Sequence, residues 1–353
     1  MLHAIVSRGL RAMPAMVLMA ALLPTAARAQ AGSSDPLVEA RDARYWLARI
    51  HEAAGKRNFQ GTFVVTAAGS VASARIVHFC EGRNQFERIE SLDGQQRQVY
   101  RYNDLVHSLW PHSRVAVVET RQAMGQFPLL LSAGADRIVP FYDVKSVGDG
   151  RVAGHEANVL LLQPKDGYRF GYRLWAERTS GLLLRSEVFD ERDVVLETSA
   201  FSEVLIGVKP RPELVLQAMK RLEGYHVERP ALREVDLGRE GWVLRELPPG
   251  FRHVSSVKRV MNAPAEEQAQ ATAAQGEFAM APPAVLQAIY SDGLTYVSVF
   301  IEPYMPRWHR REMLMAMGAT QTLTRRRGEW WITVIGDVPV VTLRTFAAAL
   351  EPR

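Results

Sequence analysis

Between Phe59 and Ile206 the chain consists of short runs rich in β-branched and aromatic residues, separated by turn-forming residues. Asp-Gly pairs between such runs are typical of β-hairpins, because a type I′ turn needs positive φ at both central positions. Strands joined by connections this short pair with their neighbours in the chain and are antiparallel. The region is therefore predicted to form an antiparallel meander, which excludes a doubly wound parallel sheet. The expected turns are Asp93-Gly94, Asp149-Gly150, Asp166-Gly167, Thr179-Ser180-Gly181 and Asp190–Asp193.

Two of these runs alternate clearly between apolar and polar residues. From Phe59 to Ala67 the odd positions are apolar or small, and from Tyr168 to Leu174 the apolar residues occupy the even positions. Each strand therefore has one apolar face. A curved sheet of such strands encloses a volume that its inward side chains either fill or leave open for an acyl chain, and the sequence favours neither. The candidates for lining this volume are Phe63, Val65, Trp110, Tyr172, Leu174 and Trp175.

A helix is predicted before the first strand. Asp35-Pro36 reads as an N-cap followed by proline at the first helical position, and Gly55 marks the end. Trp46 and Ile50 lie on its single apolar stripe, which must cover another element. We expect this helix to form a lid over the sheet, with Trp46 and Ile50 facing it.

A second, smaller domain is expected after two prolines at 210 and 212, which stop strand pairing. The predicted organisation is a large domain at 35–210, a linker at 211–240 and a small α+β domain at 241–353. Hairpins are expected about Asp292-Gly293 and Arg327-Gly328, and a final helix is expected to begin at Pro339. The fold class is thus α+β: a half-open antiparallel barrel with a helical lid, plus the small domain. Three further expectations are an apolar loop or short helix at Gln122–Ala135, a loop at Ala263–Pro283, and core packing for Met313, Met315 and Met317, with an adaptable binding face as the alternative for these methionines.

The first 29 residues have the pattern of a cleaved signal peptide. A basic segment precedes an apolar run from Ala12 to Leu23, which is shorter than the roughly 20 residues that span a membrane, and Ala27-Arg28-Ala29 suits signal peptidase. An uncleaved anchor is the alternative. Removing these residues takes away three arginines, so the formal charge falls from +5 to 5 − 3 = +2. The remaining chain is expected to be exported. Its charge does not suggest a nucleic-acid partner.

Motifs for catalysis are missing from the sequence. There is no HExxH pair and no G-x-S-x-G elbow, and the glycines of GDGRVAG at 148–154 are expected in a hairpin turn instead of a phosphate loop. Cys80 is the only cysteine, and its strand-like setting favours a buried thiol over a redox role. We therefore expect neither an enzyme nor a bound metal or cofactor. The basic residues Arg325–Arg327, with Arg307, Arg310 and Arg311, form either a solvated hairpin tip or a contact for an acidic partner or a lipid phosphate.

Several motifs, in order, resemble those of the RseB/MucB family. In the first domain they are Phe141–Val144, Val147-Gly148, Arg151–Gly154, Asp166–Phe170, Leu174-Trp175 and Thr179–Arg185. In the second they are Leu247–Phe251, Val254–Ser256, Tyr290–Leu294 and Thr333–Pro339. The resemblance covers roughly residues 40–350, although the stretch at Ala263–Pro283 looks longer than is usual in the family.

The resemblance implies a periplasmic negative regulator of a sigma-E-type envelope stress response. Such a protein binds the periplasmic region of a membrane-spanning anti-sigma factor of the RseA/MucA type and shields it from site-1 proteolysis. The large domain is similar to the LolA/LolB lipoprotein carriers, which implies a lipid, lipoprotein or lipopolysaccharide-type ligand as the stress signal. A periplasmic lipoprotein or glycolipid carrier is the alternative, and homo-oligomerisation is left open. Candidate residues for partner binding are Tyr290, Asp292, Arg325, Arg326 and Arg327.

Overall fold

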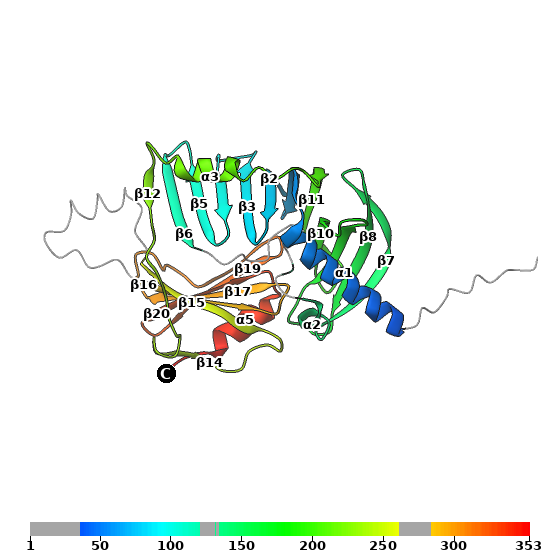
Figure 1. Cartoon of the computed structure of the whole chain (residues 1–353). Helices are drawn as coiled ribbons and strands as arrows, with labels where there is room; N and C mark the ends of the chain where they lie inside the picture. Colours follow the sequence, from blue (N-terminus) through cyan, green and yellow to red (C-terminus); the bar gives the residue numbers. More distant parts are fainter. Residues whose placement is uncertain (1–35, 121–130, 132–133, 261–283) are drawn as a thin grey trace, which may run out of the picture. The chain divides into compact units, whose positions relative to one another are not determined.

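The structure, a computed structural model, describes residues 36–120, 131, 134–260 and 284–353 (Figure 1). Residues from Pro36 onward form one compact unit. The expectations for the signal peptide, for most of Gln122–Ala135 and for Ala263–Pro283 lie outside the described residues. No helix in the described ranges has both the length and the apolar character needed to cross a membrane.

The first sheet has twelve strands, and its order is β12-β6-β5-β4-β3-β2-β1-β11-β10-β9-β8-β7. Two meanders are joined where β1 pairs antiparallel with both β2 and β11. Only β12 departs from the predicted antiparallel pattern, because it pairs parallel to β6. The strands are β1 (Phe59–Ala67), β2 (Ser70–Glu81), β3 (Asn84–Ser91), β4 (Gln98–Tyr102), β5 (Leu105–Trp110), β6 (Val115–Thr120), β7 (Tyr142–Val152), β8 (His155–Pro164), β9 (Gly171–Glu177), β10 (Leu183–Phe189), β11 (Val195–Ile206) and β12 (His226–Glu228).

The sheet is curved and, within the described residues, its two end strands do not pair with each other. Register shifts between Thr62 and Phe63, and between Ser146 and Gly148, increase the local bend. A hydrogen bond of 3.1 Å between the ring of His155 and the carbonyl oxygen of Val204 brings the start of β8 against β11. The β-rich α+β class and the meander are therefore confirmed.

The predicted turn at Asp149-Gly150 is wrong. Both residues lie inside β7, where Gly150 pairs with Ala157, and the turn falls at Ala153-Gly154 instead. Ala153 and Gly154 have φ values of 48° and 84°, so this pair supplies the positive φ that a two-residue hairpin needs. Gly150 is required for another reason: a Cβ there would lie 2.9 Å from the ring of Trp175.

Helix α1 (Pro36–Lys56) packs against the first sheet, in contact with β7, β10 and β2. The side chains of Leu47 and Ile50 are completely or almost completely buried, at 0% and 1% exposure. They join an apolar cluster that includes Tyr172 and Leu174 of β9. The helix begins at Pro36 as predicted and ends at Lys56, one residue beyond the predicted stop at Gly55. The short helices α2 (Ala135–Ile138) and α3 (Glu213–Lys220) pack beside α1 and against β4, respectively.

The second sheet has seven strands in the order β13-β15-β16-β17-β20-β19-β18. The chain passes from the first sheet to the second between Glu228, at the end of β12, and Leu232, at the start of β13. The strands are β13 (Leu232–Glu234), β15 (Arg252–Val260), β16 (Ala284–Ser291), β17 (Tyr296–Pro303), β18 (Met313–Met317), β19 (Thr320–Arg327) and β20 (Trp330–Gly336), and a separate pair is formed by β14 (Trp242–Leu244) and β21 (Leu350–Pro352).

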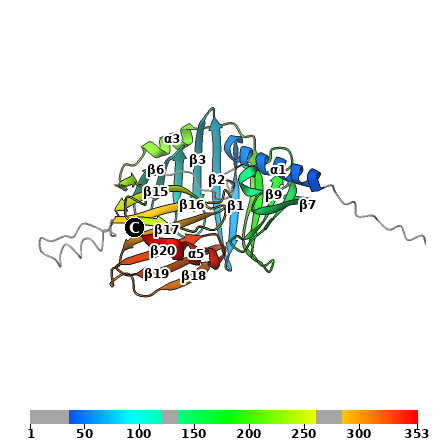
Figure 2. The same cartoon turned by 90° about the horizontal axis from the view of Figure 1, so that it is seen from below.

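Helix α5 (Val340–Ala349) lies on one face of the second sheet, over β19 and β20 (Figure 2). Its predicted apolar face is confirmed, because Leu343, Phe346, Ala347 and the following Leu350 are all completely buried. These side chains pack on alternate residues of β17 and β20 to form the core of this sheet. The helix packs over β17, β19 and β20, and β18 lies beyond them at the edge of the sheet.

The expected core packing is wrong for Met315 and Met317, whereas Met313 is half-buried. They belong to β18, the last strand of the second sheet, and Met315 and Met317 are 49% and 69% exposed. In the sequence, their apolar side chains predict a position in the core. Tertiary structure places them at an edge, on the face opposite α5, where few side chains remain to cover them.

Candidate partner-binding surface

The six residues predicted to line an apolar cavity fall in different places. Tyr172 and Leu174 belong to the cluster under α1, whereas Phe63 and Trp175 pack against a second cluster around Phe201. Because Leu174 and Trp175 are adjacent in β9, their side chains point to opposite faces of the sheet. Val65 is half-buried in β1, and the ring of Trp110 stacks under Arg97 at 5.2 Å. The structure thus brings together two separate pairs from the predicted set.

Tyr290 and Asp292, both predicted to contact a partner, are buried inside the chain. Tyr290 packs against Phe346 in the core of the second sheet, with 5.3 Å between ring centroids. Asp292 Oδ2 accepts a hydrogen bond of 2.7 Å from Arg169 Nε, and neither side chain has any exposed surface. The other oxygen of Asp292 accepts hydrogen bonds from the backbone N–H groups of Leu294 and Thr295. A partner has no access to these two residues in this arrangement.

Arg169 uses all three nitrogens of its guanidinium group, and two of them bind residues of the second half of the chain. In addition to Asp292, it donates to Asp166 Oδ2 at 2.5 Å and to the carbonyl oxygen of Pro249. Gly250, next to Pro249, has a φ of 86°, and a Cβ there would lie 2.4 Å from the ring of Phe141. A second link runs nearby, from the Thr342 hydroxyl to the carbonyl oxygen of Tyr168. The motifs at 166–170, 247–251 and 290–294 therefore meet at one junction.

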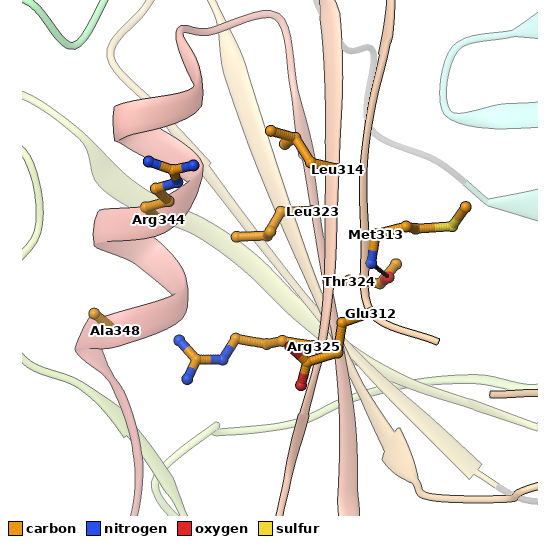
Figure 3. A pocket seen from close by; sticks show the side chains of 8 residues that line it. All are labelled: Glu312, Met313, Leu314, Leu323, Thr324, Arg325, Arg344 and Ala348. Atoms are coloured by element: carbon orange, nitrogen blue, oxygen red, sulfur yellow. Dashed lines mark hydrogen bonds between the residues drawn. The ribbon is translucent and has the colours of Figure 1, made fainter. Parts of the chain in front are cut away.

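A groove of about 560 Å³ opens between α5 and the β18–β19 hairpin (Figure 3). Leu323 and Arg325 point from β19 toward α5, whereas Met313 points to the other side of the sheet (Figure 3). The groove combines apolar side chains with two guanidinium groups and one carboxylate. The lining residues are Glu312, Met313, Leu314, Leu323, Thr324, Arg325, Arg344 and Ala348.

Only one of the three consecutive arginines at 325–327 lines this groove. Arg326 points elsewhere, with its guanidinium carbon 3.9 Å from the ring centroid of Tyr304. The guanidinium groups of Arg325 and Arg344 make neither an ion pair nor a hydrogen bond in the described residues. Glu312 is the one carboxylate in this lining, and it makes no ion pair with either arginine; its Oε1 accepts a hydrogen bond of 2.8 Å from the backbone N–H of Arg326. The groove is therefore a cationic site with an apolar floor.

Arg344 was not predicted from the sequence. It lies four residues before Ala348, so helical periodicity places both on one side of α5. That spacing was a usable signal for a shared face. Its proximity to Arg325 depends on how α5 packs across the sheet, which no local pattern reports.

The single cysteine belongs to a buried polar cluster around His78. Cys80 is half-buried and donates from Sγ to the carbonyl oxygen of Gly55, and it lies 3.3 Å from His78 Nε2. His78 Nδ1 is 3.5 Å from Glu87 Oε1, and Glu87 also pairs with Arg101. Burial by itself lowers the pKa of His78, but the contacts with Cys80 and Glu87 outweigh it and raise this pKa to about 9. No group of three or more His, Cys, Asp or Glu side chains suited to a metal ion occurs in the described part of the chain.

The charge on His78 predicts a loss of stability at alkaline pH. Its pKa is about 9 in the folded chain and near 6.5 when unfolded, so its contribution is complete below pH 6.5 and is lost as the pH rises through 9. We expect the free energy of unfolding of the wild type, relative to His78→Gln, to fall by about 2–3 kcal/mol over this interval. Urea unfolding at a series of pH values measures it. His112→Gln, at an exposed position, is the control and should parallel the wild type; a pH-independent difference for His78→Gln would contradict the charged pair.

Comparison with known proteins identifies the family of this chain. The family model of the MucB/RseB N-terminal domain matches residues 42–220, and the family model of the MucB/RseB C-terminal domain matches residues 236–351. The chain is thus a two-domain protein in which one match covers most of the first sheet and the other most of the second. It belongs to the MucB/RseB family, which confirms the resemblance carried by the motifs.

Individual relatives agree over nearly the whole chain. The sigma factor AlgU regulatory protein MucB of Pseudomonas aeruginosa is 30% identical over 321 residues, covering 90% of this chain and 93% of MucB. The sigma-E factor regulatory protein RseB of Escherichia coli K12 is 23% identical over 312 residues, covering 86% and 89%. Among solved structures, the Pseudomonas aeruginosa MucA/MucB complex matches with a TM-score of 0.63 and 27% identity over 88% of this chain and 99% of that one. MucB in complex with MucA(peri) matches with a TM-score of 0.62 at the same identity and coverage.

Proposed function

We propose that this protein is exported to the periplasm and negatively regulates a sigma-E-type stress response by binding the periplasmic region of a membrane-spanning anti-sigma factor. The observation that carries the proposal is the match of both domains, in order, to MucB/RseB, whose member MucB has been solved with MucA. The pattern of the first 29 residues supports export. We assign the large domain to 35–210, the linker to 211–240 and the small domain to 241–353.

Shielding needs no catalytic group in the protein itself. A protease requires its substrate segment as a free, extended chain, so a segment held by the regulator is withdrawn from it in proportion to occupancy. The groove beside α5 supports this role, because it offers apolar surface and two unneutralised cations at an accessible position. We propose that the regulator delays site-1 cleavage of the anti-sigma factor by such occupancy, and not by inhibiting the protease.

Protection from proteolysis tests this function. Residues 30–353 are mixed with the periplasmic segment of the host's anti-sigma factor and the site-1 protease. At a regulator concentration ten times the Kd, the cleavage rate is expected to fall about tenfold, since roughly one segment in eleven is then free. Cleavage of an unrelated peptide substrate by the same protease is the control and should not change. An unchanged rate for the anti-sigma segment, or equal slowing of both substrates, would rule the mechanism out.

We further propose that the first sheet and α1 act as a half-open barrel with a lid, and that a lipid or lipopolysaccharide-type ligand is sensed there. The support is the apolar cluster of Leu47, Ile50, Tyr172 and Leu174, which movement of α1 would expose. A ligand that binds the opened form and a partner that binds the closed form must weaken each other by the same factor.

A titration with lipopolysaccharide tests the sensing proposal. It should lower the affinity for the anti-sigma segment, and the segment should lower lipopolysaccharide binding equally. Independent binding would contradict this coupling. The alternative function, a lipid carrier, predicts transfer of bound lipid to an acceptor protein with no effect of the anti-sigma segment.

A further inference from the structure

We propose that the groove beside α5 and the open edge of β18 together bind one extended peptide segment, which adds to the second sheet as a strand and places a carboxylate between Arg325 and Arg344. This inference rests on the proposed function, because the segment would belong to the periplasmic region of the anti-sigma factor. It specifies where on this chain the segment binds and that the segment carries a carboxylate there.

The second sheet has an open edge at β18 in the described residues. β18 is the terminal strand of its sheet and pairs only with β19 in the described structure. Such an edge presents unpaired backbone N–H and C=O groups, which proteins normally protect with charges, prolines or a covering element. The strand Met313–Met317 has the sequence MLMAM and carries none of the first two. Exposed apolar residues along an open edge indicate a surface that a partner covers.

The hairpin register determines which backbone groups of β18 are free. The β18–β19 hairpin closes through a two-residue turn, with Met317 opposite Thr320. In such a hairpin the closing pair is hydrogen-bonded and every second pair is not. We infer that Leu314 and Ala316 direct their N–H and C=O groups outward. An incoming strand would therefore pair with these two residues, whose side chains lie on the face that carries the groove.

The groove beside this edge carries positive charge. Arg325 points from β19 toward α5 (Figure 3), Arg344 lines the same groove from α5, and neither has a carboxylate partner in the described residues. Arg310 and Arg311, just before β18, are exposed and carry the same sign. A second copy of this chain would bring like charges to the interface, whereas an Asp or Glu of a different chain would neutralise them. Leu314 and Leu323, directly opposite in the register, provide an apolar floor for a neighbouring side chain.

A double charge reversal tests the inference. The full mature chain carrying Arg325→Glu and Arg344→Glu is compared with the wild type for binding of the anti-sigma periplasmic segment by isothermal titration calorimetry. We expect binding at least ~30-fold weaker and a smaller dependence on salt. The matched control is Arg83→Glu with Arg192→Glu, two exposed positions in turns of the first sheet, which should bind within about twofold of the wild type.

Two further measurements separate the edge from the charges. Ala316→Pro removes an outward N–H without breaking the inferred ladder to β19, and Ala316→Lys places a charge at the edge; both should weaken binding while the melting temperature stays near that of the wild type. A panel of segments, each with one Asp or Glu changed to Lys, should contain one member that binds the doubly reversed chain better than the natural segment does.

The outcomes distinguish the two proposals. If the wild type does not bind the segment, the proposed function fails. If the wild type binds and both the reversed chain and the Ala316 variants bind equally well, only the groove assignment is overturned. Concentration-dependent dimerisation of the mature chain that Ala316→Lys abolishes would also overturn it, in favour of a second copy at this edge.

Discussion

Replacing Arg169 by Met should lower the free energy of unfolding by about 3–5 kcal/mol, the largest effect expected from a single substitution in this chain. Arg169 and Asp292 are both completely shielded from solvent, and the 2.7 Å contact between them links the two sheets. Without the guanidinium group, the carboxylate of Asp292 stays buried with its two backbone donors but no counter-ion. Urea unfolding followed by circular dichroism measures the loss.

The pair itself is tested by a double-mutant cycle with Asp292→Asn. Because the second substitution removes the buried charge that the first leaves unpaired, Arg169→Met with Asp292→Asn should cost clearly less than the sum of the two single changes. Arg173→Met is the matched control: Arg173 also pairs with a carboxylate, Glu187, but its side chain is 38% exposed, and about 1 kcal/mol or less is expected. Additive effects in the cycle would show that Arg169 and Asp292 act independently.

Ile50→Asp should destabilise the chain by about 4 kcal/mol. The isoleucine side chain is 1% exposed in the cluster under α1, so the change removes apolar burial and leaves a carboxylate without a described counter-ion in its place. A thermal melt monitored by circular dichroism gives the shift. Trp46→Asp should have a smaller effect, because Trp46 is half-buried and contacts the cluster from its margin.

The same helix offers a control for the Ile50 result. Tyr45 is 56% exposed, and Tyr45→Asp should change the free energy of unfolding by roughly 0.5 kcal/mol or less. A melting temperature that is unchanged by Ile50→Asp would mean that α1 does not dock on the sheet. Tighter binding of lipopolysaccharide and weaker binding of the anti-sigma segment by Ile50→Asp would further support the proposed role of α1 as a lid.

The strands and helix faces were largely predictable because their signals are local. Alternation along β9 and the spacing of Leu343, Phe346, Ala347 and Leu350 on α5 identify apolar faces from neighbouring residues alone. Even so, a local signal misled at Asp149-Gly150, where the glycine makes room for a tryptophan ring and the turn lies four residues later. Apolar character also misled at β18, where the methionines lie at an edge instead of in the core.

The residues that line the groove were predictable only in part. Arg325 was named from its basic context, but its neighbours Arg326 and Arg327 were named with it, although only Arg325 lines the groove. Tyr290 and Asp292 belong to a recognisable motif, and the structure shows them buried, one in a core and one in a junction. Arg344 was missed because its partner across the groove comes from another element.

The amino-acid sequence alone determined the export pattern, the hairpin-rich first half, the apolar stripes of the two helices and membership of the family. The first three depend on residues a few positions apart, where turn chemistry and side-chain periodicity act directly, and family membership rests on motifs kept in order along the chain. Tertiary structure decided which charged groups meet. Arg169 and Asp292 are 123 residues apart, and their contact exists only because two sheets pack at that point. Likewise, α5 packs over β17, β19 and β20 and not over β18, and this packing, which no sequence motif reports, leaves the groove and the open strand.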